Sequence, residues 1–174
     1  MLKRFKTDER GLAAMEFALI TPVMMLLYYG TAELTIGMMA EQRASHAASV
    51  VADLAAQEST LNTARMTDIF SVGAAILKPF PTASLKLRVT DVKADNMGVP
   101  KVIWSRAQGL SQLSTGAASG FPAGLLAAGD AVIMAEVEYT YDSPIHQALP
   151  NALTFHEKFY LRPRRSAEVT WDAG

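Results

Sequence analysis

The spacing of hydrophobic positions divides this chain into an uninterrupted apolar tract, a helical pattern and a set of alternating segments. Residues 17–32 carry no charged side chain, and no Lys or Arg occurs between Arg10 and Arg43. A helix over residues 17–32 spans roughly 24 Å, and one over residues 12–32 spans about 31 Å, close to the ~30 Å hydrocarbon core of a bilayer. The longer span includes Glu16. The tract therefore predicts a membrane-spanning helix that contains a carboxylate.

The apolar tract continues without a clear break into a pattern with a helical period. One helix is therefore predicted over residues 12–57. Pro22 lies inside it, removes one backbone donor and predicts a kink. The second half of the helix has an apolar stripe, with polar side chains largely on the other face. The predicted stripe consists of Ile36, Met39, Ala40, Ala47, Val50, Val51, Leu54 and Ala55.

A second helix and several strands are predicted after residue 57. The second helix ends before Pro79 and Pro81, and its apolar positions are Met66, Ile69, Phe70, Gly73 and Leu77. Residues 84–95 and 99–105 alternate in polarity around a turn, which predicts a hairpin. Residues 130–144 alternate most strongly, and residues 153–163 are the simplest antiparallel partner. The fold class is therefore α+β, with a long N-terminal transmembrane helix, a second short helix and an antiparallel β-sheet domain.

The segment between the second and third predicted strands has a different composition. Residues 111–130 are rich in Gly, Ala and Ser, and Pro122 interrupts them. Gly116, Gly120 and Gly124 recur every four residues, but the polar, proline-containing context favours a mobile loop over a packed helix. We expect a mobile loop here.

Composition and charge exclude several classes of protein. The chain has 174 residues, a net charge of -1 and no cysteine. Disulfides, thiolate zinc sites and cysteine nucleophiles are therefore excluded, and nothing in the charge favours binding to nucleic acid. The N-terminal leader is nevertheless basic, because its four cationic residues outnumber Asp8 and Glu9. The positive-inside bias then places the leader in the cytoplasm and the remainder across the membrane.

Residues of the types used in catalysis or metal binding are present but scattered. His46, His146 and His156 lie on three different predicted elements, and none has a metal-ligand residue three or four positions after it. Glu136 and Glu138 share one face of a predicted strand, where we expect them to keep an outward surface soluble. The cations Arg162, Arg164 and Arg165 are expected to form a solvated strand end, with an acidic neighbour or lipid headgroups as the alternatives. We therefore predict no enzyme activity, metal, cofactor or small-molecule substrate.

The N-terminal segment resembles that of TadE/TadG-like minor pilins, or pseudopilins, of the tight-adherence (Tad) pilus. The residues that carry the resemblance are Gly11, Glu16, Phe17, Pro22, Gly30 and Glu33. The resemblance extends to Leu77–Phe80, to Asp95 and Gly98 before Trp104, and to the motif from Glu136 to Pro144. It implies that a membrane prepilin peptidase cuts between Gly11 and Leu12, which makes Glu16 the fifth residue of the mature chain.

Elementary chemistry supports this processing independently. Gly11 has no Cβ, so the backbone at the cut can enter a protease site at the membrane face. Cutting creates a positive amine at Leu12, and Glu16 can pair with such an amine on a neighbouring subunit and set the register between helices. A carboxylate lying simply near the headgroups is the alternative for Glu16. Phe17, Pro22 and Glu33 are the other expected assembly residues, although a carboxylate at the outward end of a span is usually just solvated.

We therefore expect a basic cytoplasmic leader (residues 1–11), a transmembrane and amphipathic helix (12–57) and a periplasmic α+β domain (58–174). The resemblance implies a single-pass inner-membrane minor pilin that acts in pilus biogenesis and surface adhesion. Its expected partners are the prepilin peptidase, other pilins or pseudopilins, the pilus assembly platform and the membrane. Two alternatives remain: a cleaved secretory signal at the N-terminus, and an uncleaved signal-anchored periplasmic module that binds or senses an envelope ligand.

Overall fold

The computed structural model describes residues 10–118, 121–122, 124–146 and 148–173, which form two compact units. One unit combines the N-terminal residues up to Met38 with Asp142–Ala152, and the other combines Met39–Tyr141 with Leu153–Gly174. The predicted leader lies outside the described residues as far as residue 9.

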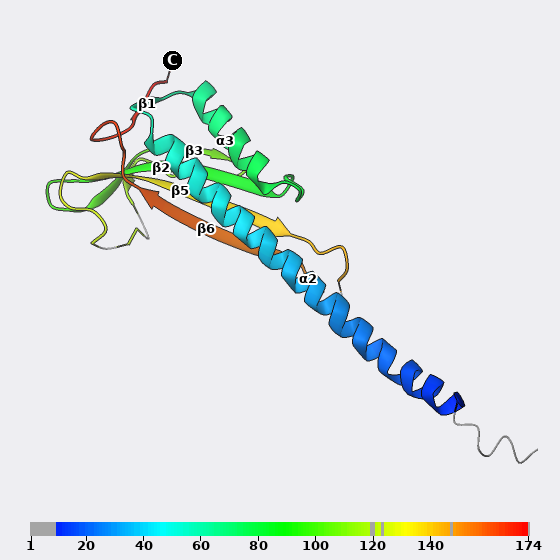
Figure 1. Cartoon of the computed structure of the whole chain (residues 1–174). Coiled ribbons are helices and arrows are strands. Elements are labelled where there is room, and N and C mark those ends of the chain that lie inside the picture. Colours follow the sequence, from blue (N-terminus) through cyan, green and yellow to red (C-terminus); the bar gives the residue numbers. More distant parts are fainter. Residues whose placement is uncertain (1–9, 119–120, 123, 147, 174) are drawn as a thin grey trace, which may run out of the picture. The chain divides into compact units, whose positions relative to one another are not determined.

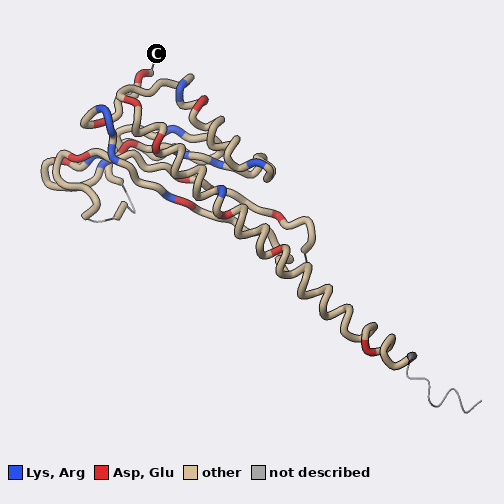
Figure 2. Tube along the Cα trace, viewed as in Figure 1, with Lys and Arg blue, Asp and Glu red and all other residues tan. Residues whose placement is uncertain are grey.

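A single helix, α2 (Arg10–Ala56), contains the whole apolar tract and the helical pattern after it. The prediction of one long helix is confirmed, and the helix continues through Pro22. Ala, Leu and Met predominate along it, and these residues have high helix propensity. Figure 2 shows that the first part of α2 is almost entirely uncharged.

The part of α2 that belongs to the second unit packs through small side chains. The prediction of a stripe that includes Met39 is wrong, because Met39 is 45% exposed, while Val50 and Leu54 are half-buried. Small residues lie at the interface because they allow the helix to approach its neighbours closely. The buried positions are Ala40, Ala44, Ala47, Ala48, Val51, Ala52, Ala55 and Ala56.

The second helix, α3 (Thr63–Leu77), follows the prediction closely. Asn62 caps its N-terminus, because the Asn62 side chain accepts a hydrogen bond from the Arg65 N–H. Its buried residues are the five predicted ones: Met66, Ile69, Phe70, Gly73 and Leu77. A Cβ placed on Gly73 would lie 2.8 Å from Val51 Cγ2 and 3.3 Å from Leu87 Cδ1, so glycine allows α3 to contact both α2 and the sheet.

The main sheet is antiparallel and has five strands in the order β4-β3-β2-β5-β6. The second part of α2 and helix α3 lie against one of its faces (Figure 1). Its strands are β2 (Leu85–Ala94), β3 (Pro100–Gln108), β4 (Gly116–Ala117), β5 (Ala131–Tyr141) and β6 (Leu153–Leu161). The predicted β2–β3 hairpin and the predicted β5–β6 pairing are both confirmed.

The turn between β2 and β3 is built by a carboxylate and a glycine. Asp95 Oδ1 accepts hydrogen bonds from the N–H groups of Met97 and Val99, each at 2.9 Å. Gly98 adopts a φ of 79°, which residues with a side chain rarely adopt. These bonds to backbone N–H and the ammonium of Lys101 lower the pKa of Asp95 below its ordinary value.

Two features of the sheet domain differ from the prediction. The described part of residues 111–130 is more than a mobile loop, because β4 pairs with β3 and Leu126 packs with Val92, Ala94 and Val102 in a buried cluster. Gly120, one of the three regularly spaced glycines, lies outside the described residues. A second, two-stranded sheet was not predicted. It pairs β1 (Thr60–Leu61) in parallel with β7 (Thr170–Trp171), two segments that are distant in the sequence.

The prediction that Glu136 faces solvent is wrong. The Glu136 side chain is only 7% exposed, and its carboxylate contacts Arg88 Nε at 2.5 Å and Lys158 Nζ at 2.9 Å. β2 and β6 flank β5, so these two cations lie on either side of Glu136 and cover it. Glu138 is more exposed and pairs with Lys86.

Two of the three C-terminal cations, Arg162 and Arg164, have acidic partners within the chain, which was one of the alternatives left open by the sequence. Arg162 contacts Asp130 at 2.7 Å, and Arg164 contacts Asp53 at 2.5 Å. The second pair and a hydrogen bond from Arg164 N to Ala56 O link the C-terminal segment to the end of α2.

Candidate functional site

The predicted processing and assembly residues lie on the exposed beginning of α2. Gly11, Leu12, Glu16, Phe17 and Pro22 are all exposed. A Cβ added at Gly11 would meet no atom within 4 Å. The fold therefore leaves this segment open to an enzyme or to a neighbouring helix, and it brings these five residues into contact with no other described element.

Large apolar side chains surround this part of the helix. A helix that is apolar on all sides is typical of a membrane span or of a buried core helix, and this part of α2 is not buried in the fold. By length and composition, α2 can cross a membrane. The exposed apolar side chains are Leu12, Met15, Phe17, Leu19, Ile20, Val23, Met24, Met25, Leu26, Leu27, Tyr28 and Tyr29.

The three threonine hydroxyl groups of α2 are bonded to the backbone of the helix. Thr21 Oγ1 donates to Phe17 O at 2.6 Å, and Thr31 Oγ1 donates to Leu27 O at 2.8 Å. Thr35 Oγ1 donates in the same way to Thr31 O. Because lipid offers no hydrogen-bond partners, such internal bonds reduce the cost of placing a hydroxyl in a bilayer.

Glu33 differs from the other predicted assembly residues because it is fully buried. Its carboxylate accepts hydrogen bonds from Ala148 N at 2.5 Å and from Leu149 N at 3.3 Å. The expectation of a solvated Glu33 is therefore wrong. The partners come from residues 142–152, which belong to the same unit as this part of the helix.

The family model described as "TadE-like protein" matches residues 11–53, and the match begins at the predicted cleavage glycine. The chain carries a TadE-like region. The resemblance of the N-terminal segment to TadE-like proteins is confirmed. The later residues to which the sequence analysis extended this resemblance lie outside the match, which ends at residue 53. Comparisons with curated proteins and with solved structures find no match.

The TadE-like region supports a structural, pilin-like role associated with the Tad pilus. Together with the apolar α2, it indicates a membrane-anchored protein. The TadE-like region ends within α2, and the sheet domain lies beyond it.

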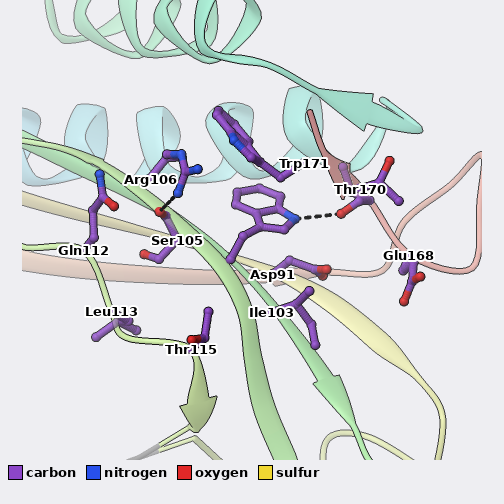
Figure 3. A pocket seen from close by; sticks show the side chains of 12 residues that line it. Asp91, Ile103, Ser105, Arg106, Gln112, Leu113, Thr115, Glu168, Thr170 and Trp171 are labelled. Atoms are coloured by element: carbon purple, nitrogen blue, oxygen red, sulfur yellow. Dashed lines mark hydrogen bonds between the residues drawn. The ribbon is translucent and has the colours of Figure 1, made fainter. Parts of the chain in front are cut away.

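A second candidate site is a cleft of about 550 Å³ in the sheet domain (Figure 3). The Trp104 and Trp171 rings lie 5.5 Å apart between centroids, and Arg106 lies 4.0 Å from the centre of the Trp171 ring. Trp104 Nε1 donates to Val169 O at 2.7 Å, which ties the C-terminal segment to β3. Figure 3 shows Arg106 beside Trp171 on one side of the cleft, and Ile103 and Thr115 on the opposite side.

Asp91 is the unusual residue of this cleft. It is fully buried, and neither carboxylate oxygen has a hydrogen-bond partner among the described residues. Burial, and then the charge of Glu168, raise the pKa of Asp91 to about 7, although Lys93 acts in the opposite direction. Glu168 itself pairs with Lys93 at 2.5 Å.

The cleft is lined by charged groups, Asp91, Arg106 and Glu168, as well as by uncharged polar and aromatic ones. The residues that line it include hydroxyls, an amide and two tryptophans, but no histidine. Within the described part of the chain, no three His, Asp or Glu side chains are grouped so that they could hold a metal ion.

Sequence reasoning did not identify Glu33, Asp91 or Glu136 as buried carboxylates. Each depends on a contact between segments far apart in the chain, such as Glu33 with Ala148. A partial signal was present for Asp91, because it continues the inward alternation of Leu87 and Val89 along β2.

Proposed function

We propose that this protein is a minor pilin or pseudopilin of the Tad pilus that acts in pilus biogenesis and surface adhesion. In this proposal the prepilin peptidase removes residues 1–11, and the helix then packs beside other pilin helices at the assembly platform. The observation that carries the proposal is that the TadE-like match, residues 11–53, covers the part of α2 whose large apolar side chains are exposed.

Glu16 supplies the specific contact of the proposed assembly. It is the only charged residue between Arg10 and Glu33, so it lies within the apolar face that would meet lipid or other helices. A carboxylate in such surroundings is costly unless it meets a cation. The new amine at Leu12 of a neighbouring subunit provides that cation, and Phe17 and Pro22 contribute the apolar contact around it.

The proposal also assigns a topology. The basic leader stays in the cytoplasm, residues 12–57 cross the inner membrane and continue beyond it, and residues 58–174 form a periplasmic domain. The positive-inside bias and the exposed apolar side chains of α2 support this arrangement.

Mass spectrometry of the N-terminus tests the processing step. The full chain, expressed with a Tad prepilin peptidase, is expected to begin at Leu12. A Gly11→Val variant should retain residue 1, because a branched side chain obstructs the backbone at the cut. The matched control is Ala13→Val, which adds the same side chain beyond the cut and should still be processed. An unprocessed wild-type chain, or one cut beyond Ala40, would contradict the proposal.

Co-isolation with other pilins tests the role of Glu16. A Glu16→Ala variant should fold and insert normally but lose its association with other pilins, because the unpaired amine is left in apolar surroundings. Met15→Ala is the matched control, since it shortens a neighbouring exposed side chain without removing charge. Normal piliation with Glu16→Ala would refute the assigned role.

The cleft supports a second candidate function, an uncleaved anchored module that binds an envelope ligand. The two tryptophans and the unpartnered Asp91 are the observations that favour it. This candidate requires an N-terminus that remains intact in the presence of the peptidase, so the same mass measurement separates the two functions.

A further inference from the structure

The connection between β5 and β6 has a composition suited to the surface of a membrane. No Asp, Glu, Lys or Arg occurs from Ser143 to His156. Apolar residues and prolines predominate in the loop: Pro144, Ile145, Ala148, Leu149 and Pro150. The connection therefore carries one charged carboxylate, Asp142 at its start, and is uncharged from there to β6. A long uncharged stretch with several apolar residues favours a partner that is itself partly apolar.

Two contacts hold this loop against α2. The buried Glu33 carboxylate accepts hydrogen bonds from Ala148 N at 2.5 Å and Leu149 N at 3.3 Å. One turn earlier on the helix, a Cβ added at Gly30 would lie 3.8 Å from Ala148 Cβ, an ordinary van der Waals distance, so the loop also lies close to the helix at this position. The loop and this stretch of helix belong to one compact unit.

Gly30 and Glu33 lie where the apolar tract ends. A helix over residues 12–32 is about 31 Å long, which matches a hydrocarbon core of ~30 Å. Tyr28 and Tyr29 precede the contact and are exposed, as is typical of aromatic residues at a membrane–water interface. The position of the contact along the helix therefore corresponds to the boundary of the bilayer.

We propose that residues 143–146 and 148–152 form a second membrane contact, a loop that lies in the lipid headgroup layer beside the end of the span and is held there by Glu33. This inference rests on the proposed membrane insertion of α2. Two backbone donors of the loop are already bonded to Glu33, and its two prolines have no N–H. The loop can therefore enter a partly dehydrated layer with fewer unpaired donors.

Site-specific fluorescence in vesicles tests the inference, and the absence of cysteine makes single labels straightforward. An environment-sensitive dye is attached at Ala148→Cys in the full chain, reconstituted in phosphatidylethanolamine–phosphatidylglycerol vesicles. Lipids that carry a quencher near the headgroup, or deep in the acyl chain, report the depth of the dye. Asn151→Cys provides a second exposed position in the loop in case the label at Ala148 disturbs the contact with Gly30.

Two reference positions complete the design. Met24→Cys lies in the middle of the apolar tract and should be quenched most by the deep quencher. Met97→Cys lies in the β2–β3 turn, 88% exposed, and should be insensitive to both lipids. The loop label is expected to be quenched severalfold more by the headgroup quencher than the Met97 label is.

Each result has a distinct meaning. A loop label that behaves like Met97, while Met24 is quenched, overturns the membrane contact and leaves the membrane span intact. That outcome also leaves a neighbouring pilin as the partner of the loop. If Met24 is not quenched, the insertion of α2 fails, and both the proposed function and this inference are overturned.

Substitution of Glu33 tests how the loop is held. Glu33→Ala should reduce quenching of the loop label without changing that of Met24, because Ala148 and Leu149 lose their acceptor. Glu33→Gln retains one side-chain oxygen and should recover part of the quenching. Unchanged quenching in Glu33→Ala would overturn the assignment of Glu33 as the residue that seats the loop.

Discussion

Replacing Asp91 by Asn should make the protein more stable at neutral and alkaline pH. Asp91 is buried in β2, and its carboxylate oxygens lack hydrogen-bond partners among the described residues. Burial is the main cause that raises its pKa from 3.8 to about 7, and the Glu168 carboxylate adds to it. The charged form is therefore disfavoured in the folded protein, whereas an uncharged amide of nearly the same shape avoids this cost.

The magnitude follows from proton linkage. Between the unfolded pKa of 3.8 and the folded pKa of about 7, the folded state binds more protons than the unfolded state, so stability falls as pH rises. The difference of about 3 pKa units, at about 1.4 kcal/mol each, corresponds to about 4 kcal/mol. This loss is absent well below the unfolded pKa and complete above the folded pKa.

Urea unfolding of the full chain in detergent micelles measures the effect. Trp104 and Trp171 are the two tryptophans of the chain, and both report on the surroundings of Asp91. The stability gained by Asp91→Asn should be small near pH 4 and rise to about 4 kcal/mol near pH 8. Because the comparison is a difference between two proteins, titration of the remaining groups cancels to a first approximation.

Asp95→Asn is the matched control, and its effect on stability at neutral pH should have the opposite sign. The pKa of Asp95 is lowered, chiefly by the Val99 N–H and then by Lys101, so its charged form contributes stability that is lost as pH falls through the folded pKa. Asp95→Asn should therefore destabilise the protein at neutral pH. An Asp91→Asn difference that stays flat with pH, or a less stable variant at pH 8, would refute the reasoning about Asp91.

Two further stability predictions concern close packing and a buried ion pair. Gly73→Ala should lower the urea midpoint by an amount equivalent to about 1–2 kcal/mol, because its Cβ would lie 2.8 Å from Val51 Cγ2; a higher midpoint would show that this contact relaxes freely. Arg88→Ala should cost about 2–4 kcal/mol at neutral pH, since it removes one of two cations beside the buried Glu136. Lys86→Ala, in a more exposed pair, should cost at most about 1 kcal/mol, and equal losses in the two variants would contradict the role of burial.

The pH dependence of Glu136 should differ from that of Asp91. Burial raises the pKa of Glu136, but hydrogen bonds and charge from Arg88 and Lys158 outweigh it and leave the pKa below its ordinary value. Its contribution to stability is therefore present above the unfolded pKa and is lost as pH falls through the folded pKa. The stability lost in Arg88→Ala should accordingly diminish in acid, which the same unfolding measurements report.

Local patterns in the sequence were sufficient to predict the elements of the fold. The apolar run at residues 17–32 requires an apolar environment. In the isolated chain, the large apolar side chains of this run are indeed exposed on α2. The buried positions of α3 follow from helical spacing, and the β2–β3 turn follows from Asp95 and Gly98. These features depend on interactions between residues a few positions apart, which periodicity and turn chemistry record directly.

The TadE-like region and its exposed helix could likewise be predicted from the sequence, because Gly11 and Glu16 occur at recognisable positions in an apolar tract. The order and register of the strands could not be predicted in this way. The pairing of β2 with β5 places Arg88 opposite Glu136, and the pairing of β1 with β7 joins residues 60 and 170.

The tertiary structure alone decided the environment of the three buried carboxylates. Alternation along a strand shows that Glu136 and Glu138 share a face, but only the neighbouring strands determine that one is covered by cations and the other is more exposed. Asp91 is enclosed in the interior of the domain, and Glu33 is covered by a loop more than a hundred residues away in the chain. A carboxylate responds to the solvent and charges around it, and these are set by long-range packing that no local pattern encodes.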